Sequence, residues 1–463
     1  MTGKLERLGV ERIFLYIAVF YGLLLIVIYP PFQGPDETSH YYRIHKLSQM
    51  KVIAGQDSDG ITGDFVEKSL TETISKAGQG VGFKKKKKID IAANLELIAN
   101  PIDNDEPVFV YMPAAVYSPV PYVPQVVGIS LGKFIFDSPI LMMYMGRLFN
   151  LAAWIALVFI AINIIPVFKN VMMLLALTPM SISQSATLSV DGVTNGLSFL
   201  LIAVLLRLAY DEEKSLQLRD AIVLLVIGIG LALCKQIYLL LLVLYFVIPH
   251  KKAGSVKKYI AVFLMVITAS ILANVLWWSL VRDLAHVNPL HEHYADISIE
   301  RQMKYILSDP LRYIGIVIST LIHKQMYHIS FIGKLGWMDT RMPYFLIYSY
   351  LVALFLVSLL EGGKTKIGIP DKLIFLIIAS SLVGAVLTIH YLAWSVVGDY
   401  SIRGVQGRYF IAFSPLVFLL FYNRSFTHYF NARPELRNAL LGVFIAYSAV
   451  TSLTAMALRY YIT

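Results

Sequence analysis

The first long apolar run of the chain ends in the sequence PPFQGPDETSHYYR, residues 30–43. Two adjacent carboxylates, Asp36 and Glu37, therefore follow directly on what reads as a membrane helix, with His40 one helical turn further on. Polar groups in such a place are costly unless they are paired or functional. We interpret Asp36 and Glu37 as the chemical centre of a membrane enzyme. The alternative is that they only complement the positive end of a helix dipole behind Pro35.

The composition indicates an all-α integral membrane protein. Of 463 residues, 57% are hydrophobic and 15% are charged, whereas soluble domains carry roughly a quarter charged residues. Lys and Arg outnumber Asp and Glu by 40 to 30, but they cluster in short loops between apolar runs, which is the positive-inside pattern and argues against nucleic acid as a partner. The single cysteine, Cys234, excludes an intrachain disulfide and a cysteine-based metal site.

The apolar runs predict about eleven membrane spans. The run at 219–248 is too long for one span of roughly 20 residues and contains Lys235, so we divide it into two spans that turn at this lysine. If the proline-rich stretch at 113–131 does not cross the membrane, the basic loops all lie on the cytoplasmic side. The N-terminus is then cytoplasmic and the C-terminus is on the outer side. The other spans are predicted at 13–29, 139–163, 168–187, 191–210, 257–281, 342–361, 371–397, 408–424 and 437–461.

This topology makes residues 1–463 one polytopic domain with three outer segments, at 32–110, 282–340 and 398–408. The first is long enough to have structure of its own, and apolar spacing behind Pro35 predicts a helix lying along the membrane surface. A run of five lysines at 84–88 also lies there. We interpret it as a solvated loop; contact with an anionic lipid or polymer is the alternative.

Polar residues from distant loops would meet at this outer face, as a membrane-surface active site requires. Several have plainer interpretations: Asp191 as a turn residue, Lys235 as its buried partner, and Trp337 as an interfacial aromatic. Three histidines, His286, His291 and His293, could suggest a metal cluster, but we interpret them as solvated loop residues and predict no metal site. The candidate residues are Asp36, Glu37, His40, Tyr41, Asp191, Lys235, Tyr238, Trp337, Asp339, Arg403, Gln406, Arg408 and Tyr409.

These motifs together resemble a bacterial family long labelled only as predicted membrane proteins of unknown function, which is similar to the GT-C glycosyltransferases. The resemblance covers residues 30–415, and the insertion at 52–104 has no counterpart in it. It rests on Pro35-Asp36-Glu37 with His40, a Tyr/Pro stretch at 117–124, Lys235 before Ile237-Tyr238, Gly336-Trp337 with Asp339, and Gly404-Val405-Gln406-Gly407-Arg408-Tyr409.

The resemblance implies a GT-C-like fold and an inverting glycosyltransferase of the bacterial cytoplasmic membrane. Such an enzyme takes a sugar from a polyprenyl-phosphate donor at the extracytoplasmic face and transfers it to a cell-envelope glycan or lipid. The acid that matches the family pattern is Asp36, with Glu37 beside it. Transfer needs a base for the acceptor hydroxyl and cations for the phosphate, for which Lys235, Arg403 and Arg408 are candidates. The sequence indicates no certain cofactor and leaves a divalent cation, Mg²⁺ or Mn²⁺, open.

Two other functions compete with this one. A polysaccharide polymerase or ligase would also face outward, but typically relies on arginines in a large loop. A transporter or flippase of lipid-linked sugar should have inverted repeats and charges at the bilayer midplane. The sequence has no internal repeat, and most of its polar residues lie at span ends, so glycosyl transfer is the preferred hypothesis.

Overall fold

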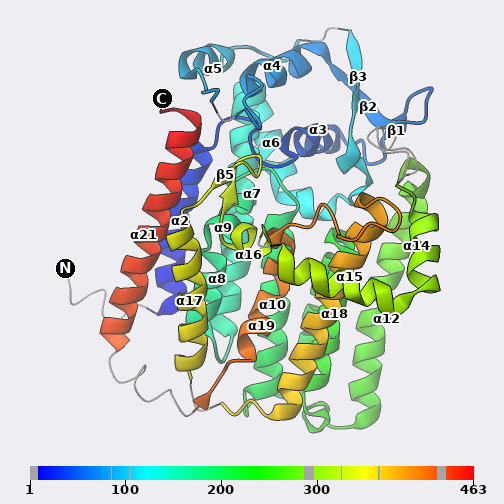
Figure 1. Ribbon diagram of the computed structural model, residues 1–463, viewed down its shortest axis with the longest axis vertical. Helices are drawn as coiled ribbons and strands as arrows, with labels where there is room; N and C mark the ends of the chain where they lie inside the picture. Colours follow the sequence, from blue (N-terminus) through cyan, green and yellow to red (C-terminus); the bar gives the residue numbers. More distant parts are fainter. Residues whose placement is uncertain are drawn as a thin grey trace.

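The computed structural model describes residues 9–84, 86–103, 106–285, 297–324, 326–362, 365–424 and 434–462. Long apolar helices run side by side, and a small cap of short helices and strands covers one end of them (Figure 1). We call this end the site end. The opposite end carries the connections at 211–217 and 249–255 and is called the far end.

Within the described residues, six helices are long and apolar enough to cross a membrane. A seventh would be the pair α14 (Ile299–Ser308) and α15 (Pro310–His323), which is bent by 107°. The protein is thus a mostly helical, multi-spanning membrane protein, whereas the count of eleven spans stays a prediction. The six helices are α2 (Val10–Ile28), α7 (Pro139–Ile164), α10 (Asp191–Tyr210), α12 (Val256–Val281), α18 (Ile369–Trp394) and α21 (Pro434–Tyr460).

Burial separates central from peripheral helices. In its most apolar window α10 has 78% of its residues buried, whereas α12 has only 11%. The exposed residues of α12 include Leu264, Leu272 and Leu276. A helix that is apolar all round and exposed to this extent is suited to lipid contact, so α12 lies at the rim of the bundle and α10 at its centre.

As predicted, the apolar run at 219–248 is divided into two segments at Lys235. Helix α11 (Leu218–Cys234) ends at Lys235, and a 3-10 helix, η3 (Gln236–Val247), returns to the far end, where Leu216 N donates to Lys252 O at 2.8 Å. Since an α-helix rises about 1.5 Å per residue and a 3-10 helix about 2.0 Å, both segments are about 25 Å long. The charged side chain of Lys235 is thereby brought to the site end.

The prediction of one continuous span at 168–187 was wrong. The segment forms two short buried helices, α8 (Lys169–Ala176) and α9 (Pro179–Ser185). Pro179 has no N–H to continue the first helix, and the Thr178 hydroxyl caps the second by accepting from Ser181 N at 3.2 Å. Other predicted spans correspond to α17 (Tyr344–Leu360) and to the pair η6 (Gly407–Phe413) and α19 (Ser414–Leu419).

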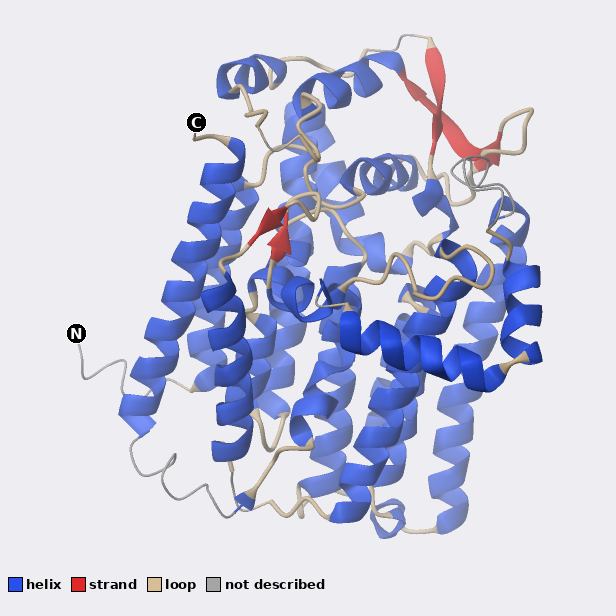
Figure 2. Ribbon diagram, viewed as in Figure 1, coloured by secondary structure: helices blue, strands red, loops and turns tan. Residues whose placement is uncertain are grey.

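The cap adds β-structure that the all-α prediction lacked. An antiparallel sheet, red in the cap in Figure 2, consists of β1 (Gly55–Gln56), β2 (Thr62–Glu67) and β3 (Pro107–Tyr111) in the order β1-β2-β3. Phe65 of β2 pairs with Phe109 of β3. Helices α4 (Lys68–Gly78) and α5 (Ile91–Leu97) complete it. A two-stranded pair, β4 (Lys334–Leu335) with β5 (Thr340–Arg341), lies further along the chain.

The helix predicted behind Pro35 exists as α3 (Glu37–Ser48), whereas its position along the membrane surface stays a prediction. Tyr41 and Ile44 are fully buried, and α3 packs against α6 (Val123–Phe136). As predicted, the proline-rich stretch does not reach the far end: α6 starts beside Asn150 of α7 and ends near Met142, close to the start of α7. The remaining short helices are η1 (Pro113–Val116), η2 (Val120–Tyr122), η4 (His250–Ala253), η5 (Arg282–Ala285) and α16 (Met326–Ile332).

Candidate functional site

A cavity of about 380 Å³ lies at the site end, where segments far apart in the sequence meet. It is bounded by the α2–α3 turn, the start of α10, the break between α11 and η3, the end of α18 and the start of η6. Seven of the residues predicted from the sequence line it: Asp36, His40, Asp191, Lys235, Tyr238, Arg408 and Tyr409.

Three of the charged residues reach the cavity because they stand at helix ends. Asp191 is the first residue of α10, and Arg408 is the second residue of η6. Lys235 stands at the break after α11 with extended backbone (φ −153°). Helix ends leave room for polar side chains that the apolar middle of a span does not tolerate, so the ends of neighbouring spans converge on a charged site.

The charges alternate in sign across the cavity. Lys235 Nζ contacts one carboxylate oxygen of Asp191, and Arg408 Nη1 lies 3.7 Å from the other. Arg408 Nη2 lies 3.6 Å from Asp36 Oδ2. The Asp191 and Arg408 side chains are buried, whereas that of Asp36 is 63% exposed. Of the two carboxylates that line the cavity, Asp36 is therefore the one that a ligand can reach more directly.

The ring of Tyr409 lies beneath both cations. Lys235 Nζ is 5.4 Å from the ring centroid, and the Arg408 guanidinium carbon is 5.3 Å from it. Tyr238 supports this arrangement, since its hydroxyl donates to the Tyr409 carbonyl at 2.9 Å. The aromatic face stabilises positive charge in a place from which water is partly excluded.

Asp36 has a left-handed backbone conformation, with φ 58° and ψ 11°. Few residues other than glycine adopt it, although Asp and Asn tolerate it better than most, and such strained residues concentrate at functional sites. The conformation must be held by neighbouring contacts, and the next residue, Glu37, supplies them.

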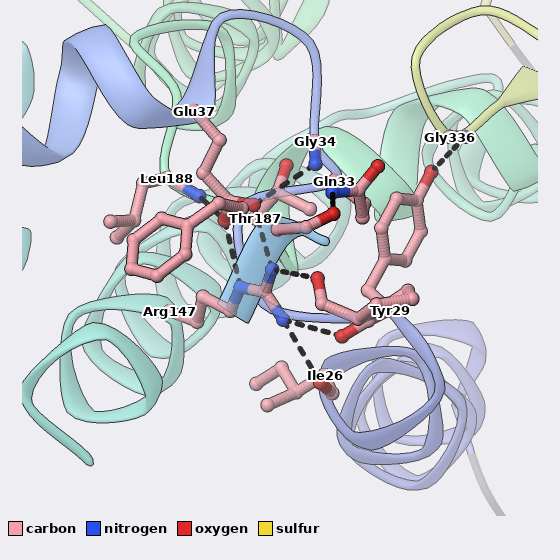
Figure 3. Close-up of polar contacts among 12 residues, drawn as sticks. Ile26, Tyr29, Gln33, Gly34, Glu37, Arg147, Thr187, Leu188 and Gly336 are labelled. Carbon is pink, nitrogen blue, oxygen red and sulfur yellow. Dashed lines mark hydrogen bonds and ion pairs between the residues drawn. The ribbon is translucent and has the colours of Figure 1, made fainter. Parts of the chain in front are cut away.

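Glu37 does not line the cavity. It is fully buried, and its carboxylate accepts two hydrogen bonds from Arg147, each 2.7 Å long (Figure 3). It also accepts from the backbone N–H groups of Gly34 and Leu188, both at 2.9 Å. All of its hydrogen-bonding capacity is used inside the protein, so its position favours a structural role.

Arg147 connects this carboxylate to the end of the first span. Its Nη1 donates to the Tyr29 carbonyl at 2.8 Å, and its Nη2 donates to the Pro30 carbonyl at 2.9 Å (Figure 3). These are carbonyls that the end of α2 leaves without helical partners. The ion pair therefore fixes the turn between α2 and α3, from which Asp36 projects.

His40 is neutral at physiological pH. Its Nδ1 lies 2.7 Å from the Tyr122 hydroxyl. Burial lowers the pKa of His40 to about 4; the nearby carboxylates, Asp36 first, oppose this shift, and the cations, Arg408 first, add to it. A neutral imidazole can donate or accept a hydrogen bond in the cavity without adding a charge to it.

Other predicted residues lie elsewhere. Arg403 does not line the cavity; its Nε donates to Asp399 at 2.8 Å in an exposed ion pair. The hydroxyl of Tyr41 donates to the Pro139 carbonyl at 2.9 Å. Gln406 is not among the residues that line the cavity. Of the predicted phosphate-binding residues, the structure brings together Lys235 and Arg408 only.

The Gly336–Asp339 motif belongs to a second polar cluster. Trp337 donates from Nε1 to the Phe32 carbonyl at 3.3 Å. Asp339 pairs with Arg459 at 2.6 Å, near the end of α21. These contacts attach the motif to the turn after the first span and to the last span, and neither Trp337 nor Asp339 lines the cavity.

Sequence reasoning missed His390 and Trp394, which line the cavity from the last turns of α18. The ring of His390 is 4.9 Å from that of Tyr409, and its Nδ1 donates to the Val386 carbonyl at 2.8 Å. The indole of Trp394 is half exposed. A histidine inside an apolar run was a usable signal, but nothing local showed which side of the helix faced a cavity.

No group of three or more His, Cys, Asp or Glu side chains suited to a metal ion occurs in the part of the chain that the structure describes. The carboxylates that line the cavity are Asp36 and Asp191, and both lie within ion-pair distance of Arg408. His286, His291 and His293 lie outside the described residues.

The chain belongs to the family described as DUF2142, predicted membrane protein, whose model matches residues 19–417. The match includes every residue that lines the charged cavity. No curated protein and no solved structure matches the chain. The predicted resemblance to a family of predicted membrane proteins is thus confirmed.

Proposed function

We propose that the protein is a glycosyltransferase that moves a sugar from a polyprenyl-phosphate donor to a hydroxyl group of a cell-envelope glycan or lipid. It would work at the extracytoplasmic face of the bacterial cytoplasmic membrane. The observation that carries the proposal is the alternating series Lys235, Asp191, Arg408 and Asp36 along one cavity at the ends of the spans. The series offers two cations for a phosphate and an open carboxylate for a hydroxyl proton.

The cationic end of the series suits the leaving group. As the bond from the sugar to the phosphate oxygen breaks, negative charge builds on the lipid phosphate, and fixed positive charges in a water-poor site stabilise it. Asp191 holds Lys235 and Arg408 in place without neutralising both. Within the described residues, Arg408 Nε is buried and has no hydrogen-bond partner, which leaves an N–H donor for an incoming phosphate.

The open end suits the acceptor. The acceptor hydroxyl oxygen would attack the anomeric carbon, its proton would pass to the Asp36 carboxylate, and the sugar–phosphate bond would break with its electron pair on the phosphate. A single displacement of this kind inverts the anomeric centre. The exposure of Asp36 leaves room for a sugar, and the half-exposed Trp394 indole offers a flat apolar surface beside it.

An apolar groove next to the cavity suits the lipid chain. It has a volume of about 370 Å³ and is lined by Leu321, Tyr327, Phe331, Val383, Phe410, Val417 and other, mostly apolar, residues. Consecutive residues of η6 line the cavity and the groove: Arg408 and Tyr409 line the charged cavity, and Phe410 lines the apolar groove. A donor with a phosphate and an isoprenoid tail has this combination of polar and apolar parts.

Donor binding tests the proposal. Lys235→Ala and Arg408→Ala should each weaken binding of the polyprenyl-phosphate donor about ten- to a hundredfold, the effect of losing one charge-assisted contact of about 1.5–3 kcal/mol. Arg403→Ala is the matched control, because Arg403 lies nearby in sequence but outside the cavity. Equal losses in Arg403→Ala and Arg408→Ala, or no loss in either, would contradict the assignment.

A further inference from the structure

A second, strongly apolar cavity lies at the site end, beside the first and last spans. Its volume is about 480 Å³, and it is lined by residues of α2, α5, α7 and α21, among them Val27, Ile28, Leu95, Leu453 and Tyr461. Helix α2 ends at Ile28 and α21 ends at Tyr460. The cavity is thus located where two spans leave the apolar part of the membrane.

Helix α5 forms the outer wall of this cavity, and hydrogen bonds hold its start against the end of α21. Asp90 caps it by accepting from Ala93 N at 3.1 Å, and Ile89 N donates to the Tyr460 carbonyl at 2.8 Å. Two apolar residues of α5 are nevertheless exposed, Ile91 to 54% and Leu95 to 60%. A short helix fixed at the end of two spans with its apolar side chains uncovered has the character of an interfacial membrane element.

The lysine run at 84–88 leads directly into this wall. Lys88 Nζ donates to the Leu458 carbonyl at 2.6 Å, which anchors the run to the end of α21. Lys84 and Lys86 are exposed. From residue 84 to 98 the sequence has five lysines against two acids, Asp90 and Glu96, a net charge of +3 (5 − 2), and Asp90 is already used as a helix cap.

We infer that this cavity is a binding site for an anionic phospholipid of the surrounding bilayer. Its acyl chains would occupy the apolar cavity, and its phosphate would lie against Lys84 and Lys86. A basic run next to a membrane attracts anionic headgroups, by about fivefold in binding for each lysine at low salt. The site lies on a different set of helices from the charged cavity and does not depend on the proposed transfer reaction.

Headgroup selectivity tests the charged part of the inference. Native mass spectrometry of the purified full-length protein would compare phosphatidylglycerol with phosphatidylcholine of the same acyl chains. Wild type should bind phosphatidylglycerol more tightly, and Lys84→Gln with Lys86→Gln should reduce this preference by up to about thirtyfold at low salt. The control is Lys251→Gln with Lys257→Gln, an exposed pair at the far end. Equal affinity of wild type for both lipids, or an equal effect of both double variants, would overturn the inference.

Filling the cavity tests its apolar part. Val27 of α2 lines this cavity, whereas Val19, two turns earlier on the same helix, lines a separate apolar cavity against α7. Val27→Trp should displace the lipid and lower its affinity about tenfold, since roughly two buried methylene groups would lose their contacts. Val19→Trp should leave the affinity unchanged. If the two variants behave alike, the acyl chains lie elsewhere and the inference is wrong.

Discussion

Asp36 and Glu37 are neighbours in the sequence, yet their side chains have opposite surroundings. One is 63% exposed in the charged cavity, and the other is fully buried against Arg147. The sequence pointed to both acids, because both follow an apolar run. It could not separate them, since the difference depends on the left-handed backbone at Asp36 and on an arginine 110 residues away.

The buried ion pair predicts that Glu37 supports the fold. Glu37→Gln leaves the Arg147 guanidinium buried without its counter-charge, which should lower the free energy of unfolding by about 3–5 kcal/mol. Asp36→Asn is the control and should change it little, because Asn also tolerates the left-handed conformation. Chemical unfolding in one detergent measures both variants. Equal stability of Glu37→Gln and wild type would contradict the structural role.

His40 predicts a pH dependence of stability. Its pKa is about 4 in the folded protein and about 6.5 in an unfolded chain, so the unfolded state binds more protons between these values. The contribution of neutral His40 to the free energy of unfolding is complete above about pH 6.5 and is lost as the pH falls towards 4. The free energy of unfolding changes with a slope of at most about 1.4 kcal/mol per pH unit over this range. His40→Gln should remove this part of the slope. The prediction fails if wild type and variant have parallel stability profiles between pH 4 and 7.

At the scale of elements, η6, which lines both the charged cavity and the apolar groove, packs closely against α16. A Cβ on Gly407 would lie 2.0 Å from the Tyr327 carbonyl oxygen and 2.2 Å from Phe331 N, and both of these are backbone atoms. Gly407→Ala must therefore displace η6, and with it Arg408. We expect a loss of stability of about 1–3 kcal/mol or more, together with weaker donor binding.

The control for this substitution is Gly315→Ala in α15. A Cβ there would meet no atom within 4 Å, and alanine in a helix is favoured over glycine by about 0.5–1 kcal/mol. Thermal unfolding and donor binding of both variants give the comparison. A Gly407→Ala protein as stable as Gly315→Ala, with normal donor binding, would show that the contact between η6 and α16 does not hold Arg408 in place.

The elements that the sequence predicted well are those with a long, uninterrupted apolar pattern, such as α2, α7 and α18. The break at Lys235 was also predictable, because a lysine inside so long an apolar run is costly. The two short helices at 169–185 were not predicted, although Pro179 and the polar residues of α9 interrupt the apolar pattern there. The small sheet of the cap was missed because it depends on pairing between β2 and β3, which no local pattern records. Strand β3 begins at Pro107, 40 positions after β2 ends at Glu67 (107 − 67).

At the scale of the whole molecule, the arrangement of the helix ends predicts a topology. In a variant without the buried Cys234, single cysteines at Lys86 and Ser401 should react with an impermeant reagent from outside the cell, because both positions are at the site end. Cysteines at Ser255 and Thr365, at the far end, should react only after the cells are opened. Labelling of Ser255 from outside would contradict the division of 219–248 into two crossing segments.

The charged cavity unites residues from 36 to 409, which is most of the length of the chain. The sequence could nominate its members because each is a polar residue at the end of an apolar run. It could not exclude Trp337 and Asp339, which satisfy the same rule but contact the turn after the first span and the last span instead. Which polar ends share a cavity is decided by helix packing across the whole bundle, which no local pattern records.

The most direct test of the account is turnover by purified protein in lipid nanodiscs. The assay would supply a lipid extract containing polyprenyl-phosphate sugars and an envelope-glycan acceptor, and would measure glycosylated product together with released polyprenyl phosphate. We expect wild type to form both, and Asp36→Asn to bind the donor and keep its fold while forming neither. Turnover by Asp36→Asn at the wild-type rate would contradict the assignment of Asp36 as the base that accepts the acceptor proton.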